Sequence, residues 1–237
     1  MSDTLPPLVD ESALAAYLAE RLPGDGELVV ERHQAGHSNE TFFVTRGGRG
    51  GGDEWVLRRP PRGAFLPSAH DVGREYRVLS ALGETAVRSP RTILMCEDEA
   101  IIGAPFYLME RVRGRVIRSD LPEIFTEEQR TAIGDELVDA LVELHAVDPA
   151  SCGLDTFGKP TGYLERQLRR WTGQMELTLP HTRPLPELQR IGEWLHAHLP
   201  ETAQTTLVHG DYKLDNVIFA DRTPPSLVAI LDWEMST

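Results

Sequence analysis

The amino-acid sequence predicts an α+β protein built from two lobes, the first rich in strands and the second rich in helices. Short runs of Val, Phe and Thr between turn-forming residues fill much of the first 110 residues. Helical periodicity then dominates until about residue 200, and short apolar strands return before the end of the chain. We expect residues 1–110 to form one lobe, residues 111–237 to form the other, and a ligand cleft to lie between them.

The first lobe is expected to contain five antiparallel strands and two helices. The expected elements are a helix at 10–22, strands at 27–33, 40–46 and 54–59, a helix at 68–82, and strands at 91–97 and 105–110. Ser68 is a suitable N-cap for the second helix, because its hydroxyl can accept a hydrogen bond from a backbone N–H of the first turn. Four apolar side chains at helical spacing predict the buried stripe of that helix: Val72, Tyr76, Leu79 and Leu82.

The second lobe is expected to begin with a helix at Thr126, because Thr126 and Gln129 have the spacing of a capping box. Further helices are expected near 160–176 and 184–199, followed by strands at 205–208, 216–219 and 227–231. Two large aromatic residues of these helices, Trp171 and Trp194, are expected to pack in the core or between helices.

The composition is that of a globular protein, with 41% hydrophobic and 26% charged residues. A net charge of −13 argues against nucleic-acid binding, which normally requires a basic face. No apolar run reaches the ~18 residues of a membrane span, and the N-terminal residues are acidic where a signal peptide would be basic. We expect a soluble, cytoplasmic protein that acts on a small molecule, with no nucleic-acid or membrane partner. The composition predicts no oligomeric state.

The segment 207–232 carries the residues best suited to catalysis. His209, Asp211 and Asn216 have the spacing His-x-Asp-x₄-Asn of a kinase catalytic loop, and Asp232 follows the next apolar strand. In that loop the first Asp accepts the proton of the attacking hydroxyl, while the Asn and the later Asp hold Mg²⁺ against the phosphates of ATP. We therefore expect Asp211 to be the base, and Asn216 and Asp232 to be magnesium ligands. His209 is expected to brace the loop by hydrogen bonding.

A kinase also needs a cation on a strand of the first lobe, oriented by a glutamate on a helix. Lysine is absent before residue 159, so the strand around Val56 offers arginine instead. Because alternate residues of a strand share a face, Val56 would floor the nucleotide pocket and Arg58 would meet the phosphates. Glu75, in the middle of the following helix, is the expected partner of Arg58.

Two glycine-containing segments compete as phosphate-binding loops. Residues 47–52 are rich in glycine, but they lack the Gly-Lys-Ser/Thr ending of a P-loop and indicate a hairpin tip. The segment 36–39, between the first two strands, is the better cover for phosphates. Its backbone N–H groups and the side chains of Ser38 and Asn39 can reach a phosphate.

Several motifs taken together resemble the aminoglycoside phosphotransferase-like family: HGDYKLDN…LDWE, WVLRRPP, GREYRVL, FYLMERVRG and YLERQLRRW. The resemblance covers about residues 28–237 and is strongest to the branch that includes the kinase-like domain of acyl-CoA dehydrogenase fusion proteins. It implies a bilobal protein-kinase-like fold and ATP-dependent phosphorylation of a small-molecule hydroxyl group. It implies the same roles for Asp211, Asn216, Asp232, Arg58 and Glu75.

The resemblance also implies a hinge, formed by Met109, Glu110 and Arg111, whose backbone meets adenine. Many relatives carry lysine where this chain has Arg58. Relatives usually continue beyond the DWE motif with helices that complete the acceptor pocket, whereas this sequence stops five residues after Asp232. We therefore expect those C-terminal helices to be missing, and the 237 residues to bind MgATP but to transfer phosphate poorly.

The acceptor is left open by the sequence. A hydroxyacyl compound fits the branch that the motifs resemble, and an aminoglycoside or a macrolide antibiotic is the alternative. A kinase-like module that binds nucleotide without turnover is a third interpretation, favoured by Arg58 and by the early end of the sequence.

Overall fold

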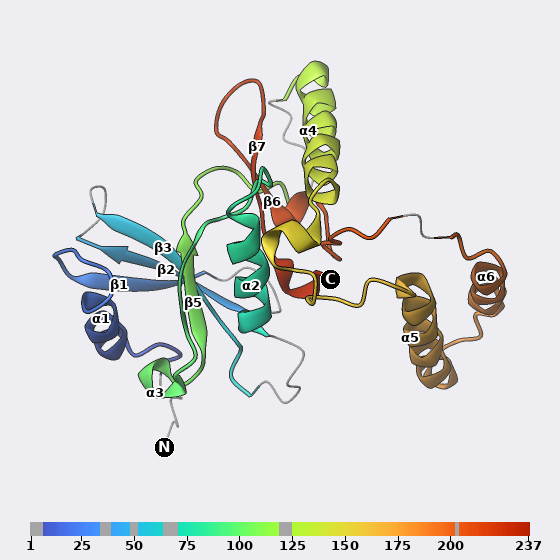
Figure 1. Cartoon of the computed structure of the whole chain (residues 1–237), viewed down its shortest axis with the longest axis horizontal. Coiled ribbons are helices and arrows are strands. Elements are labelled where there is room, and N and C mark those ends of the chain that lie inside the picture. The colour runs from blue at the N-terminus through green and yellow to red at the C-terminus, as the bar shows by residue number, and fades with distance from the viewer. Residues whose placement is uncertain (1–6, 34–38, 48–51, 64–70, 119–124, 202–203) are drawn as a thin grey trace.

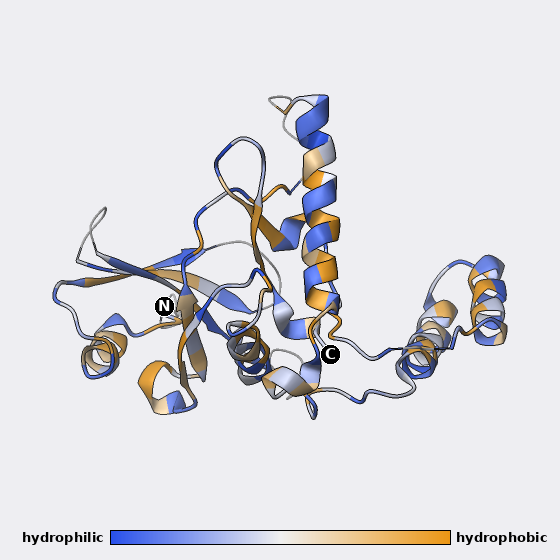
Figure 2. Cartoon of the chain, turned by 45° about the horizontal axis from the view of Figure 1, so that its top comes forward, coloured by the Kyte–Doolittle hydropathy of each residue, from blue (hydrophilic) through white to orange (hydrophobic). Residues whose placement is uncertain are grey.

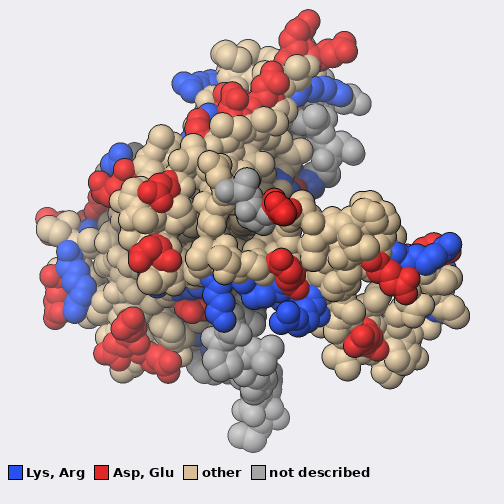
Figure 3. Space-filling model, turned by 45° about the vertical axis from the view of Figure 1, so that its right-hand side comes forward, with Lys and Arg blue, Asp and Glu red and all other residues tan. Residues whose placement is uncertain are grey.

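The computed structural model describes residues 7–33, 39–47, 52–63, 71–118, 125–201 and 204–237. An antiparallel sheet forms the N-terminal part of the molecule, and most of the helical residues lie in the C-terminal part, so the predicted α+β class is confirmed (Figure 1). Among these residues, no helix combines the length and the apolar character needed to cross a membrane. On the face drawn in Figure 3, acidic side chains are scattered over the surface, in keeping with the charge of −13.

The five strands of the N-terminal sheet are antiparallel and lie in the order β1-β2-β3-β5-β4. They are β1 (Leu28–His33), β2 (Glu40–Arg46), β3 (Asp53–Arg59), β4 (Thr92–Cys96) and β5 (Phe106–Glu110). The helices of this part are α1 (Glu11–Ala19), α2 (Val72–Leu82) and the short α3 (Glu99–Ile102), which the sequence analysis did not predict.

Strand alternation divides the buried residues of this sheet between two cores. On β5, Phe106 and Leu108 face the core that includes α1, whereas Tyr107 and Met109 face the core that includes α2. The second core continues into the C-terminal part of the chain and includes Trp233. The sheet and the C-terminal loops therefore share one apolar core, and this shared packing sets the position of the loops.

Helix α2 begins at Val72, and the Asp71 side chain caps it by accepting a 2.9 Å hydrogen bond from the Arg74 N–H. The predicted cap, Ser68, is wrong and lies outside the described residues. Along the helix, Val72, Leu79 and Leu82 are buried as expected, whereas Tyr76 is half-buried. The carboxylate of Glu75 is buried on the same helix.

Among its described residues, the C-terminal part contains three longer helices and a two-stranded hairpin. They are α4 (Glu127–His145), α5 (Tyr163–Thr178), α6 (Pro186–Ala197), β6 (Val217–Phe219) and β7 (Leu227–Ile230). The described residues of this part also form four 3₁₀ turns: η1 (Pro149–Cys152), η2 (Leu179–His181), η3 (Leu214–Asn216) and η4 (Trp233–Met235). The capping box of Thr126 and Gln129 is present at the start of α4.

Two expectations for this part are wrong. Residues 205–208 form no strand: Val208 exchanges backbone hydrogen bonds of 2.8 and 2.9 Å with Thr237, and no neighbouring strand extends the pairing. Trp171 and Trp194 are 60% and 58% exposed, because α5 and α6 pack against one another and lie apart from the sheet (Figures 1 and 2). Neither helix buries a residue.

Candidate functional site

One cavity of about 1180 Å³ lies between the sheet and the loops around β6 and β7. It is lined by every described residue that the sequence analysis assigned to the base, the metal or the nucleotide: Asn39, Val56, Arg58, Glu75, Met109, Glu110, Arg111, Asp211, Asn216 and Asp232. Ser38 lies outside the described residues. Ten side chains spread over nearly two hundred residues of sequence thus meet at one cavity.

Two residues of the loop before β6, Asn216 and Lys213, hold the side chain of Asp211 in place. The Asn216 Nδ2 atom donates hydrogen bonds of 2.9 Å to both the backbone oxygen and the Oδ2 atom of Asp211. Lys213 Nζ lies 2.9 Å from the same Oδ2 atom. The Asp211 side chain keeps 38% of its surface exposed, so it is oriented by the loop and still open to the cavity.

His209 joins this loop to the end of β7. The ring is buried, its Nε2 atom lies 2.8 Å from the Leu231 carbonyl oxygen, and its Nδ1 atom accepts the Asp211 N–H at 3.3 Å. This pattern requires a neutral imidazole with its proton on Nε2. Burial lowers the pKa of His209 below its ordinary value of 6.5. The bracing role expected for His209 matches these contacts.

Backbone geometry places the two loops close together. Gly210 has φ = +88°, and a Cβ atom there would lie 2.5 Å from the Met235 carbonyl oxygen, so only glycine fits. Asp232 has φ = 63° and ψ = 66°, the left-handed conformation, and is the single non-glycine residue with positive φ in the described part of the chain. Such strain concentrates at functional sites and here sets the direction of the Asp232 carboxylate.

Glu75 lies at the centre of a buried polar cluster and contacts each of its other members. Its Oε1 atom accepts hydrogen bonds from Arg58 Nη2 at 3.1 Å and from the Trp233 N–H at 3.3 Å. Its Oε2 atom accepts from Arg58 Nε at 3.3 Å and from Asn39 Nδ2 at 3.5 Å. The predicted pair of Arg58 and Glu75 is therefore present. Glu75 links α2 to the start of β2, to β3 and to the loop after β7.

Arg58 also contacts Asp232, one of the two residues that we expect to bind magnesium. Its Nη2 atom lies 3.1 Å from Asp232 Oδ1, so one guanidinium bridges two carboxylates. Burial by itself would lower the pKa of Arg58, but the charge of Glu75 raises the pKa above its ordinary value of 12.5. Burial raises the pKa of Glu75 above 4.5, and the Arg58 charge opposes that shift. The planar fork of arginine suits this double pairing better than an ammonium group would.

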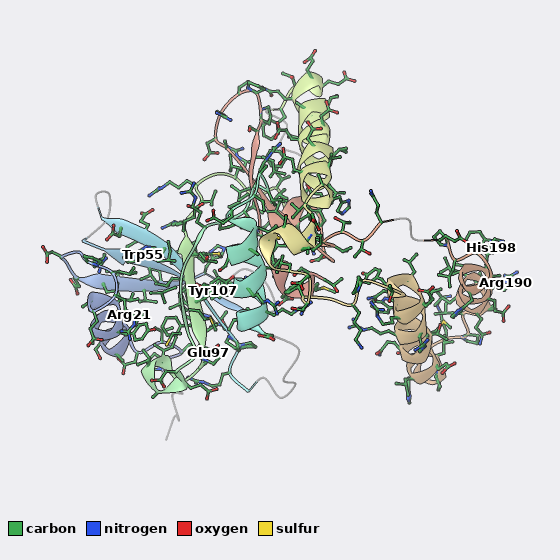
Figure 4. The ribbon with its side chains drawn as sticks, in the orientation of Figure 1. Arg21, Trp55, Glu97, Tyr107, Arg190 and His198 are labelled. Atoms are coloured by element: carbon green, nitrogen blue, oxygen red, sulfur yellow. The ribbon has the colours of Figure 1, made fainter. Side chains whose placement is uncertain are left out.

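The sequence analysis missed Phe43 and Lys213, which line the cavity, and Tyr107, which lies opposite Arg58 on the neighbouring strand. Phe43 on β2 pairs with Val56 on β3. The Arg111 guanidinium lies 4.0 Å from the centre of the Phe43 ring. Tyr107 lies opposite Arg58 across β3 and β5 and faces α2 (Figure 4). Pairing the predicted strands residue by residue would have found both. Lys213 was overlooked although the chain has only one other lysine.

The residues that could hold a metal ion are few. Among the described residues, no three carboxylate, imidazole or thiol side chains are grouped so that they could bind a metal. The cavity instead offers the Asp232 carboxylate and the Asn216 amide, whose Oδ1 atom is not used in the hydrogen bonds to Asp211. Oxygen donors of this kind fit Mg²⁺, which is usually bound by one or two protein groups together with waters and substrate phosphates.

Comparisons with known proteins agree with this geometry. Residues 29–237 match the phosphotransferase enzyme family. The chain is 39% identical over 235 residues to acyl-CoA dehydrogenase family member 11 of Rattus norvegicus, covering 96% of this chain and 29% of that protein. The chain therefore spans less than a third of that relative's length.

Two solved structures share the fold. A protein of Ralstonia eutropha, provisionally named an aminoglycoside phosphotransferase, is 37% identical, with a TM-score of 0.82 over 97% of this chain and 66% of that one. The GDP and kanamycin complex of APH(2")-IIIa is 18% identical, with a TM-score of 0.69 over 94% of this chain and 73% of that one. The family resemblance stated from the motifs is confirmed, and the chain belongs to the phosphotransferase enzyme family.

Proposed function

We propose that the chain is the catalytic part of a small-molecule kinase, which transfers the γ-phosphoryl group of ATP to an alcohol with the help of Mg²⁺. The observation that carries the proposal is the meeting of Asp211, Asn216, Asp232 and Arg58 in one cavity. A carboxylate base, two oxygen donors and a fixed cation are the groups that phosphoryl transfer needs, because it depends on positioning and charge stabilisation.

In the proposed reaction the acceptor hydroxyl oxygen attacks the γ-phosphorus and forms the new O–P bond. The bond from the γ-phosphorus to the β–γ bridging oxygen breaks, and its electron pair leaves with ADP. Asp211 accepts the proton of the hydroxyl, for which its half-exposed carboxylate beside Asn216 is suited. The contacts of His209 with Leu231 and with the Asp211 N–H hold the base in place.

The remaining residues of the cavity are assigned to the nucleotide and the metal. Asn216 and Asp232 would hold Mg²⁺, which when bound neutralises phosphate charge. Arg58, fixed by Glu75, would bind the inner phosphates, and the side chains of Ser38 and Asn39 would cover them. Val56 would floor the adenine pocket. Backbone groups of the hinge would meet adenine: Met109, Glu110 and Arg111.

The relatives suggest two acceptor classes. Similarity to acyl-CoA dehydrogenase family member 11 favours a hydroxyacyl compound, and we propose this class first. The name of the Ralstonia protein favours an aminoglycoside, which is the second candidate. The ion pair between Arg58 and Asp232 supports a third possibility, a module that binds nucleotide without turnover, because the pair engages a proposed metal ligand.

Nucleotide binding and turnover test the proposal together. We expect ATP to raise the melting temperature more with Mg²⁺ than with EDTA, since a ligand stabilises the state it binds. GTP in parallel would establish the nucleotide preference. ADP formation is then measured with hydroxyacyl thioesters and with aminoglycosides as acceptors. Equal shifts with Mg²⁺ and EDTA would contradict the metal assignment, and binding without acceptor-dependent ADP would favour the non-catalytic module.

A further inference from the structure

Arg74 precedes Glu75 on α2 and reaches from that helix to two loops of the C-terminal part. Its Nη1 atom donates a 3.0 Å hydrogen bond to the Phe157 carbonyl oxygen, and its Nη2 atom donates one of 3.0 Å to the Ser236 carbonyl oxygen. The guanidinium also lies 3.8 Å from the centre of the Phe157 ring. Because a guanidinium is planar and carries several N–H donors in fixed directions, one arginine can hold both loops at once.

The loop that contains Ser236 begins with Asp232, which is a proposed metal ligand. Asp232 has the left-handed conformation, and the turn η4 follows it directly. Glu75 holds the first residue of this turn by accepting the Trp233 N–H at 3.3 Å. Arg74 holds the residue after the turn, Ser236, whose hydroxyl donates a 2.6 Å hydrogen bond back to the Trp233 carbonyl oxygen. Two adjacent residues of α2 therefore fix the two ends of η4.

The influence of Arg74 on the site is indirect. Arg74 is not among the described residues that line the cavity, whereas Glu75 and Asp232 are. A left-handed backbone is unfavourable for a residue that has a side chain, and it persists only where the surrounding structure imposes it. Loss of the contact with Ser236 would allow η4 to move and the Asp232 backbone to relax, which would redirect the Asp232 carboxylate.

On the basis of the proposed function, we propose that Arg74 is a positioning residue, which fixes η4 and thereby sets the direction in which the Asp232 carboxylate meets Mg²⁺. Mg²⁺ requires nearly ideal octahedral coordination, so a misdirected carboxylate binds it less tightly. Arg74 itself contacts neither the metal nor the nucleotide. Its replacement should therefore lower the affinity for the metal ion and hardly change the binding of nucleotide without metal.

Manganese provides a readout that does not depend on activity, because Mn²⁺ accepts the same oxygen ligands as Mg²⁺ and is observed by electron paramagnetic resonance. Mn²⁺ is titrated into AMP-PNP with the chain in excess, so that all of the nucleotide is bound. We expect Arg74→Gln to weaken Mn²⁺ binding about tenfold, as expected for loss of a charged hydrogen bond, and to leave the AMP-PNP affinity in EDTA within about a factor of two. Arg74→Lys keeps the charge but not the fork, and should fall between Arg74→Gln and the wild type.

Arg77→Gln is the matched control. Arg77 lies on the same helix and donates a 2.9 Å hydrogen bond to Thr156 Oγ1, in the loop that also contains Phe157. Within the described residues it makes no hydrogen bond to η4. Arg77→Gln should therefore change neither the Mn²⁺ affinity nor the AMP-PNP affinity. Circular dichroism verifies that each variant is folded at the temperature of the titration.

The outcomes separate this proposal from the proposed function. Unchanged Mn²⁺ binding in both Arg74 variants, or an equal loss in Arg77→Gln, would overturn the role of Arg74 and leave the kinase proposal intact. A loss of AMP-PNP affinity in EDTA as large as the loss for Mn²⁺, or failure of both Arg74 variants to fold, would also overturn it, because Arg74 would then be structural only. Absence of nucleotide and Mn²⁺ binding by the wild-type chain would overturn both proposals.

Discussion

Helices α2 and α5 are both amphipathic in sequence, yet α2 buries five of its side chains and α5 buries none. Helix α2 lies against the sheet and the turn η4, and Arg74 fastens it by donating hydrogen bonds of 3.0 Å to the carbonyl oxygens of Phe157 and Ser236. Helix α5 packs against α6 within the part of the chain that the structure describes. An amphipathic pattern therefore predicts that a face can be buried, but not which surface covers it.

The difference between the two helices extends to chemistry. Glu75 on α2 joins the cavity through Arg58, Asn39 and the Trp233 N–H, whereas no residue of α5 or α6 is among those that line it. The proposed phosphoryl transfer should accordingly depend on the region around α2 and the loops before β6 and after β7, and hardly on α5.

The largest expected effect concerns Asp211, the proposed base. Asp211→Asn keeps the size of the side chain and removes the proton acceptor, so acceptor-dependent turnover should fall on the order of 10²–10⁴-fold with little change in nucleotide affinity. Glu176→Gln, on the exposed surface of α5, is the control and should keep normal turnover. Wild-type turnover in Asp211→Asn would show that the cavity does not carry the chemistry.

A second pair of variants compares the two helices directly. Leu79 on α2 is 1% exposed and Leu177 on α5 is 73% exposed. Leu79→Ala should lower the free energy of unfolding by about 2–5 kcal/mol, because it leaves a cavity in a packed core. Leu177→Ala should change it by less than about 0.5 kcal/mol. Chemical denaturation measures both, and a similar loss in the two variants would mean that α5 is covered in solution.

Replacing Arg58, which pairs with both Glu75 and Asp232, should have a smaller effect on stability and nucleotide binding. Arg58→Lys keeps the charge but replaces a fork that bridges Glu75 and Asp232 by a single ammonium group. We expect a loss of about 1–2 kcal/mol in the free energy of unfolding, together with weaker nucleotide binding. Arg170→Lys on the exposed surface of α5 should be neutral. If Arg58→Lys were equally neutral, the bridge would contribute nothing that lysine cannot supply.

The smallest effect is a dependence on pH. Because burial lowers the pKa of His209, the unfolded chain binds more protons than the folded chain as the pH falls below about 6.5. The contribution of His209 to stability is therefore complete above that pH and is lost as the pH falls through the lowered folded-state value. His209→Gln should flatten the decline of melting temperature between pH 7.5 and 5.5, whereas His196→Gln on α6 should not. Parallel curves for wild type and His209→Gln would contradict the assignment.

Much of the fold could be predicted from local patterns. Alternating apolar residues placed β1 to β5 within a residue or two, and the capping box placed the start of α4. The N-cap of α2 was mistaken, because Ser68 and Asp71 are both good caps and only the observed start of the helix distinguishes them. The predicted strand at 205–208 is absent for a similar reason, because a short apolar run does not specify a neighbouring strand to pair with.

The sequence by itself determined most of the strands, the longer helices and the catalytic-loop motif, because strand alternation, helical periodicity and the spacing His-x-Asp-x₄-Asn are short-range properties. Only the tertiary structure decided that Arg58 reaches Asp232, which lies 174 residues further along the chain, and that Lys213 pairs with Asp211. It also decided that Trp171 and Trp194 remain exposed while Trp233 is buried. These outcomes depend on which surfaces meet in space, and the energy of an ion pair or an apolar contact is set by neighbours that local sequence does not specify.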